Sequence, residues 1–121
     1  MGLILADTNI VIYTLKGIPA IQQYVDNDFG LSDISVIELL GVKSIDDTIF
    51  TARKAYIDAA YIYPLNESIR QIAIKLKQRY ILKVPDAIIA ATAIHYDIPL
   101  LTADKGFVRL KELSAIIISL V

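Results

Sequence analysis

Short apolar runs, separated by segments with helical spacing, constrain the fold of this chain more than any other feature. Residues 3–6, 61–65, 99–102 and 115–120 are four such runs, and residues 29–31 are a weaker one. Strands that are apolar throughout are typical of a parallel sheet buried on both faces. Their alternation with helices therefore predicts an α/β fold with helices covering both faces of a central parallel sheet.

The helices are predicted from caps and from apolar spacing. Asn66 is suited to cap a helix, Ser35 and Glu38 have the spacing of a capping box, and Pro85 favours a helix start just before Asp86. The predicted helices cover residues 8–15, 20–25, 35–40, 47–60, 67–79, 86–96 and 107–113.

A length of 121 residues with 55% hydrophobic residues supplies one core, so we expect a single domain over residues 1–121. The absence of cysteine excludes disulfides, zinc–thiolate sites and thiol nucleophiles. No uncharged stretch approaches the ~20 residues that a membrane span needs. The first residues do not have the pattern of a signal peptide, so we expect a cytoplasmic protein with no membrane partner.

Four acidic residues come from segments that this topology brings to one edge of the sheet. Asp7 and Asp104 each follow directly from a predicted strand. Glu38 and Asp86 are predicted in the first turns of helices, and such helix starts lie at the same edge. We therefore expect the four carboxylates to converge there.

Four neighbouring carboxylates cannot all stay ionised near neutral pH unless a cation balances their charge. Their hard oxygen atoms suit Mg²⁺ or Mn²⁺. Either metal can lower the pKa of a bound water and neutralise charge on a phosphodiester. The pattern thus indicates metal-dependent hydrolysis of phosphoesters.

Each residue also has a purely structural interpretation. Asp7 and Asp104 can serve as helix caps, Glu38 as half of a capping box, and Asp86 as a charge complementing the helix dipole. His95, the single histidine, falls late in an apolar helix and is expected to be structural.

The net charge of −1 argues against a nucleic-acid binder, whose surface is usually basic. If the four acids surround a cation, however, the rest of the chain has nine acidic residues (13 − 4) against twelve Lys and Arg. Its balance of +3 (12 − 9) is compatible with a nucleic-acid partner. A basic run with one aromatic residue is either a rim that faces RNA or a solvated helix face. It consists of Lys75, Lys77, Arg79, Tyr80 and Lys83.

Four sequence segments, taken in order, have a familiar form. They are Leu5-Ala6-Asp7-Thr8-Asn9, Ser35-Val36-Ile37-Glu38-Leu39, Val84-Pro85-Asp86-Ala87-Ile88-Ile89-Ala90-Ala91-Thr92-Ala93 and Leu100-Leu101-Thr102-Ala103-Asp104-Lys105-Gly106-Phe107. Together they resemble the PIN-domain family and, within it, the VapC-type toxins of toxin–antitoxin pairs. The resemblance covers nearly the whole chain. It departs from the family at Gly106, where a histidine often precedes the phenylalanine.

The resemblance implies a three-layer α/β/α domain with a central parallel sheet. It implies an endoribonuclease that depends on Mg²⁺ or Mn²⁺, acts on RNA, forms a homodimer and is silenced by a cognate antitoxin. By matching position it assigns catalytic and metal-binding roles to Asp7, Glu38, Asp86 and Asp104, with Asp104 the more variable ligand. It assigns supporting polar roles to Asn9, Ser35 and Thr102.

Three other functions are compatible with parts of this pattern. A phosphorelay receiver domain has a similar length and strand-end acids, but Thr8 and Pro64-Leu65-Asn66 stand where its acids are required. A nuclease-like fold that only binds RNA or protein is a second alternative, and retention of all four acids argues against it. A PIN nuclease that processes RNA without acting as a toxin is the third, and the compact chain favours the toxin.

Overall fold

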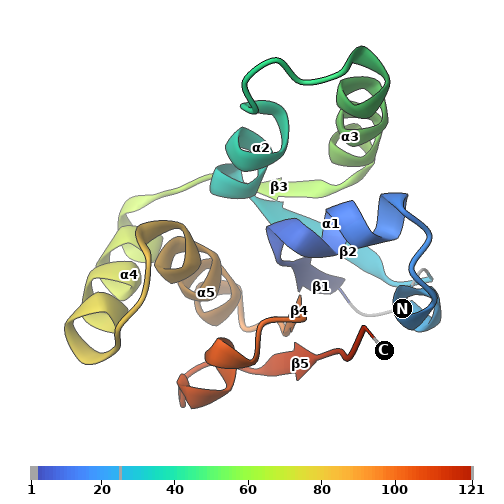
Figure 1. Ribbon diagram of the computed structural model, residues 1–121. Coiled ribbons are helices and arrows are strands. Elements are labelled where there is room, and N and C mark those ends of the chain that lie inside the picture. The colour runs from blue at the N-terminus through green and yellow to red at the C-terminus, as the bar shows by residue number, and fades with distance from the viewer. Residues whose placement is uncertain (1–2, 25, 121) are drawn as a thin grey trace.

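The computed structural model describes residues 3–24 and 26–120, which form a parallel sheet of five strands in the order β3-β2-β1-β4-β5 (Figure 1). In the central strand, Leu5 is paired with Gly30 on one side and Leu100 on the other. The parallel sheet confirms the predicted α/β class. The strands are β1 (Leu3–Ala6), β2 (Asp28–Ser32), β3 (Tyr61–Tyr63), β4 (Leu100–Thr102) and β5 (Ala115–Ile117).

Helices cover both faces of the sheet, which gives the expected three-layer α/β/α arrangement. In Figure 1, α4 and α5 lie together on one side, and α1 lies on the other side near α3. The α-helices are α1 (Thr8–Leu15), α2 (Asp33–Leu40), α3 (Asp47–Ala59), α4 (Glu67–Arg79) and α5 (Val84–Tyr96). Two short 3-10 helices are η1 (Pro19–Tyr24) and η2 (Lys105–Arg109).

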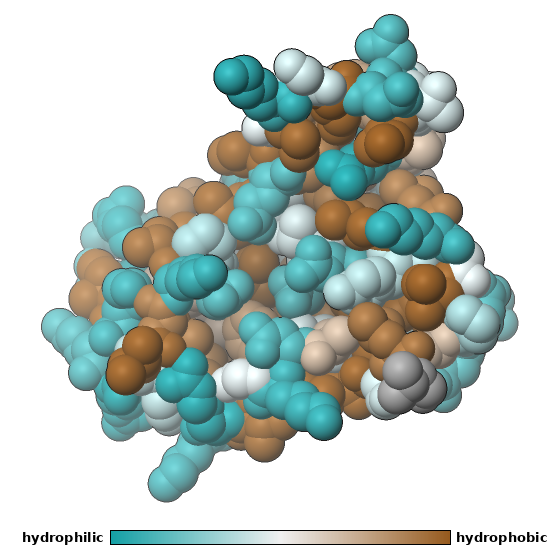
Figure 2. All heavy atoms as spheres, viewed as in Figure 1, coloured by the Kyte–Doolittle hydropathy of each residue, from teal (hydrophilic) through white to brown (hydrophobic). Residues whose placement is uncertain are grey.

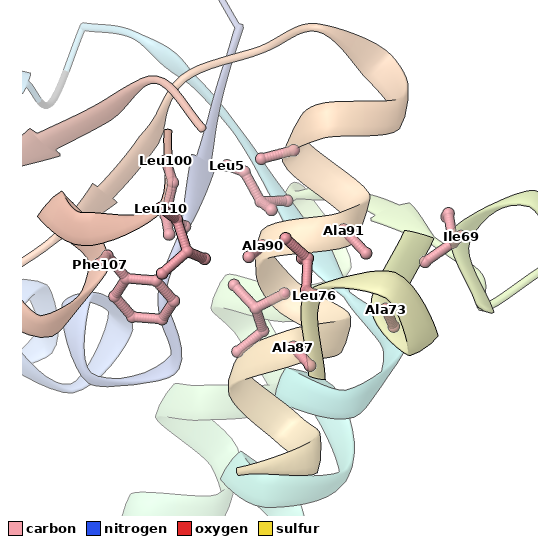
Figure 3. Close-up of a cluster of buried hydrophobic side chains, with 12 residues drawn as sticks. Leu5, Ile69, Ala73, Leu76, Ala87, Ala90, Ala91, Leu100, Phe107 and Leu110 are labelled. Carbon is pink, nitrogen blue, oxygen red and sulfur yellow. The ribbon is translucent and has the colours of Figure 1, made fainter. Parts of the chain in front are cut away.

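The sheet separates two hydrophobic cores. Because successive side chains of a strand point to opposite faces, Leu5 and Leu100 enter the core beneath α4 and α5, whereas Ile4 and Leu101 enter the core beneath α1 and α3. Figure 3 shows Leu5 and Leu100 directed toward the alanines of α5 and toward Phe107. Burial on both faces explains why these strands are apolar throughout.

Helix α5 fits between the sheet and α4 because its buried positions are small. Ala87, Ala90, Ala91 and Ala93 are each almost inaccessible to solvent. Alanine lets the backbones approach closely and has the highest helix propensity. This closely packed helix carries Asp86 in its first turn.

Several predicted boundaries differ from the structure. Ser35 does not cap α2: the cap is Ser32, whose hydroxyl accepts the Ile34 N–H at 3.3 Å, so the capping-box prediction was wrong. Glu38 consequently lies in the second turn of its helix, not the first. The predicted helix over residues 107–113 is instead the 3-10 helix η2.

The helix predicted over residues 20–25 is the 3-10 helix η1 up to Tyr24, and residue 25 lies outside the described residues. The strands predicted over residues 61–65 and 115–120 are shorter than expected. By contrast, Asn66 caps α4 as predicted, its Oδ1 accepting the Ile69 N–H at 2.8 Å. In the described part of the chain, no helix has the length and apolar character needed to cross a membrane.

Candidate active site

Asp7 lies at the carboxyl end of the central strand and is 8% exposed. Its Oδ1 accepts the Thr8 backbone N–H at 2.8 Å, so Asp7 caps α1. Its Oδ2 accepts the hydroxyl of Thr102, the last residue of β4, at 2.7 Å. The helix-cap interpretation of Asp7 is thus correct, yet the same carboxylate is also fixed by a buried side chain 95 residues away in the sequence.

Thr102 connects two of the predicted acids. Its hydroxyl is fully buried; it donates to Asp7 and accepts the Asp104 backbone N–H at 3.0 Å. The exposed Asp104 carboxylate in turn caps η2, its Oδ1 accepting the Gly106 N–H at 2.8 Å. Thr102 therefore links the Asp7 carboxylate to the backbone that carries Asp104, and its supporting role in the site stays a prediction.

Glu38 is held at the same edge by Thr8. The Thr8 Oγ1 lies 2.7 Å from Glu38 Oε1 and 2.8 Å from the buried Ser35 Oγ. A hydroxyl has only one proton and a carboxylate only accepts, so Thr8 donates its proton to Glu38. The contact between the two hydroxyls is then a hydrogen bond that Ser35 donates to Thr8. Ser35 thus contacts the residue that binds Glu38, and its supporting role in the site stays a prediction.

Asp86 occupies the first turn of α5 as predicted and is partly buried. Burial raises its pKa, and the negative charges of Asp104 and Glu38 raise it further, whereas Lys83 lowers it. Burial likewise raises the pKa of Asp7, to which Asp86 and Asp104 also contribute, while hydrogen bonds from Thr102 and Thr8 oppose the rise. The four predicted acids therefore act on one another electrostatically across one edge of the sheet.

In this structure the acidic side chains of the described residues are not close enough together to coordinate one metal ion. Among residues 3–24 and 26–120, no three Asp, Glu or His side chains are grouped closely enough to hold a metal ion as they stand. Mutual repulsion favours this spacing when no cation is present. Gathering the carboxylates around an ion requires side-chain rotation, for which the exposed Glu38 and Asp104 have room.

A divalent cation fits the chemistry of this site. The donors are carboxylate oxygens, with no sulfur or imidazole among them, as Mg²⁺ and Mn²⁺ prefer. Burial and, after it, the like charges of neighbouring acids raise the pKa of both Asp7 and Asp86, and a bound cation would oppose the effect of the like charges. A cation would thus stabilise the ionised state that these carboxylates need as ligands.

Asn9, a predicted supporting residue, and His95, which was not assigned to the site, both stand apart from this network. Asn9 is exposed, and its side chain makes no hydrogen bond within the described residues. His95 is exposed near the other end of α5 from Asp86, with its ring edge-on to Tyr96 at 4.7 Å.

Sequence reasoning gave Thr8 no place in the candidate site. The signal that could have identified it is its place directly after Asp7, on the first turn of a helix that starts at the sheet edge. From there its side chain contacts α2, which begins at the same edge.

A cleft of about 320 Å³ opens beside two of the acids. In Figure 2, hydrophilic residues gather in the middle of the visible face, between α2 and α3 above and α4 and α5 at the side. The cleft is lined by Ile81, Leu82, Lys83, Asp86, Asp104, Gly106, Phe107 and Arg109.

Comparison with known proteins agrees with this architecture. The family model described as the PIN domain matches residues 4–113, which include all four predicted acids. No curated protein matches the sequence significantly.

Solved structures share the fold over almost the entire chain. A chain of a toxin–antitoxin complex from Klebsiella pneumoniae is 28% identical, with a TM-score of 0.77, and the alignment covers 90% of this chain and 93% of that one. A chain of VapBC-1 from nontypeable Haemophilus influenzae is 26% identical, with a TM-score of 0.78 and coverage of 97% and 98%. A chain of DNA-bound VapBC from Salmonella typhimurium, 16% identical, has a TM-score of 0.81 with coverage of 96% and 98%, and shows likeness of fold.

Proposed function

Because this chain belongs to the PIN-domain family, which is a family of nucleases, we propose that it is a metal-dependent endoribonuclease and the toxin of a toxin–antitoxin pair. The observation that carries the proposal is the environment of Asp7. This buried carboxylate is oriented by Thr102 and Thr8 and lies within the electrostatic reach of Asp86 and Asp104.

In this proposal Asp7, Glu38 and Asp86 hold Mg²⁺ or Mn²⁺, and Asp104 supplies a fourth carboxylate. When bound, such a metal lowers the pKa of a water molecule and neutralises charge that develops on the phosphate. The protein contributes preorganisation, because groups that are already oriented need no reordering during the reaction.

Three neutral residues provide that preorganisation. Thr102 fixes the Asp7 carboxylate from the adjacent strand, and Thr8 fixes Glu38 from the first turn of α1. Ser35 supports Thr8 from the buried side of α2. None of them is a candidate nucleophile, since each hydroxyl is already engaged and the single histidine lies far along α5.

The direct test is cleavage of a panel of end-labelled RNAs by purified protein in Mg²⁺, Mn²⁺ or EDTA. We expect cleavage only with metal, and its loss in Asp86→Asn. Asp97→Asn is a matched control, because it makes the same chemical change at the other end of the same helix. Its φ of 53° is a backbone conformation that asparagine tolerates well. Equal cleavage by Asp86→Asn and the wild type would remove Asp86 from the site.

The toxin role and its partner need a separate test. Solved relatives are toxin–antitoxin complexes, which supports a protein antitoxin as the partner of this chain. We expect expression to arrest growth, Asp86→Asn to relieve the arrest, and co-expression of an adjacent antitoxin gene to relieve it as well. A cleaving protein that leaves growth unaffected would instead favour the RNA-processing alternative. The homodimer stays a prediction from the family resemblance, and light scattering of the purified protein tests it.

A further inference from the structure

The cleft that contains Asp86 and Asp104 also contains two cationic side chains, Lys83 and Arg109. We infer that these cations bind a backbone phosphate of the RNA adjacent to the bond that is cut. They would thereby position the strand over the carboxylates. The inference rests on the proposed function and assigns RNA-positioning roles to two residues outside the acidic set.

Arg109 is already fixed in place. Its Nε donates to the Gly106 carbonyl at 3.0 Å, and its Nη2 donates to the Ile81 carbonyl, so one side chain joins η2 to the α4–α5 loop. Both partners are uncharged, and the guanidinium keeps its full positive charge. A guanidinium has five N–H donors, and three of them are left for a ligand. A group fixed in advance loses little conformational entropy when it binds a phosphate.

Lys83 lies just before α5 and is exposed. Its side chain has no hydrogen bond or ion pair with any residue that the structure describes, yet its charge is close enough to lower the pKa of Asp86. Among the described residues, neither Lys83 nor Arg109 forms an ion pair with a carboxylate, although Asp86 and Asp104 line the same cleft.

The other members of the basic run are engaged elsewhere. Arg79 forms an ion pair with Glu112, and Lys77 donates to the Leu82 carbonyl at 2.6 Å. Lys75 lines a separate pocket with Arg79. Lys83 is therefore the member of the run that faces the candidate active site, and the predicted RNA-facing rim reduces to Lys83 together with Arg109.

A phosphate is the ligand that these observations favour. A polyanion approaching Asp86 and Asp104 is repelled unless nearby cations offset their charge. A fixed guanidinium and a mobile ammonium together suit the oxygens of a phosphodiester. Such a contact is made equally in the ground and transition states, so it should affect binding of RNA more than the chemical step.

The test measures RNA binding without cleavage. Fluorescence anisotropy of a labelled single-stranded RNA in EDTA would compare wild type, Lys83→Ala, Arg109→Gln and the double variant. Lys16→Ala is the matched control, because it removes one exposed positive charge at the far end of α1. Titration from about 50 to 200 mM salt gives the number of phosphate contacts from the slope of log K against log salt.

We expect each single variant to weaken binding about tenfold and to reduce the salt slope by about 0.7. The double variant should reduce the slope by about 1.4, and Lys16→Ala should leave it unchanged. With metal present, KM for cleavage should rise while kcat changes little.

The inference would be overturned if the Lys83 and Arg109 variants had the same salt slope as Lys16→Ala, or if the wild type bound no RNA at the lowest salt. Weaker binding of an antitoxin by these variants would not rescue it. Because binding is measured in EDTA, this failure is distinct from absence of nuclease activity. Arg109→Lys separates charge from structure, since it keeps the cation but cannot bridge two carbonyls. A salt slope in Arg109→Lys as low as in Arg109→Gln, with a lowered melting temperature, would show that Arg109 acts only by ordering the loop.

Discussion

Replacing Thr102 by valine removes one hydroxyl and nearly preserves the shape of a fully buried side chain. Two hydrogen bonds are lost, one donated to the Asp7 carboxylate and one accepted from the Asp104 N–H. A hydrogen bond to a charged group contributes about 1.5–3 kcal/mol and a neutral one about 1 kcal/mol. We therefore expect the free energy of unfolding at pH 7 to fall by about 2–4 kcal/mol.

The assay is thermal unfolding in EDTA, followed by circular dichroism. With an unfolding entropy of roughly 2.1 cal/mol/K per residue, a chain of 121 residues loses about 4 °C of melting temperature for each 1 kcal/mol. Thr102→Val should thus melt about 8–16 °C below the wild type. Thr102→Ser keeps the hydroxyl and is the control; it should recover most of the loss.

The destabilisation should also depend on pH. The hydrogen bond from Thr102 lowers the pKa of Asp7, so its removal makes ionised Asp7 more costly in the folded state. Once the carboxyl is protonated, only neutral hydrogen bonds are lost, and the difference between variant and wild type should shrink to about 1–2 kcal/mol. A difference below about 1 kcal/mol at pH 7, or one that does not change with pH, would refute the proposed link between Thr102 and Asp7.

Three further predictions concern stability. Without metal, Asp86→Asn should raise the melting temperature at pH 7 whereas Asp97→Asn should not, because ionised Asp86 is partly buried among like charges; an unchanged or lower melting temperature would contradict this. Since the folded-state pKa values of Asp7 and Asp86 are raised above 3.8, their ionisation opposes folding as pH rises past that value. The advantage of Asp86→Asn should therefore vanish on titration toward pH 3.8, and saturating Mg²⁺ should reverse it by stabilising the wild type more. Gly30→Ala should lower the free energy of unfolding by about 1–3 kcal/mol, because the new Cβ would lie 2.5 Å from Tyr63 Cε2. Urea unfolding measures this loss. Gly106→Ala is a milder comparison, because its Cβ would lie 3.0 Å from Asp104 Oδ1.

Secondary structure was predictable where one strong local signal had no competitor. Asn66 is the only good cap between β3 and α4, and both the cap and the helix are as predicted. The α2 start was mistaken because Ser32 and Ser35 are both suitable caps. Strand β2 runs into α2 without a loop, so the earlier serine is placed at the helix start and the later one is buried inside the helix.

The candidate site was predictable from topology to the level of the sheet edge. Parallel strands place Asp7 and Asp104 at one edge whatever their side-chain conformations. Pro85 lies in the first turn of the helix that carries Asp86, and this helix begins two residues earlier than predicted, at Val84. The contact between Thr8 and Glu38 depends on how α1 packs against α2, which a single sequence does not encode locally. How closely the acidic side chains approach one another depends on their rotamers, which the topology does not fix, so this too required coordinates.

The pairing of β1 with β4 has a consequence for the newly made chain. Residue 7 leaves the ribosome 95 residues before Thr102, which fixes its carboxylate. At about 5–20 residues per second, that interval lasts on the order of 5–20 s. During it the central strand lacks one neighbour, Asp7 lacks the Thr102 hydroxyl, and Asp104 does not yet exist. The four acids of the candidate site can therefore come together only when nearly all of the chain has been synthesised.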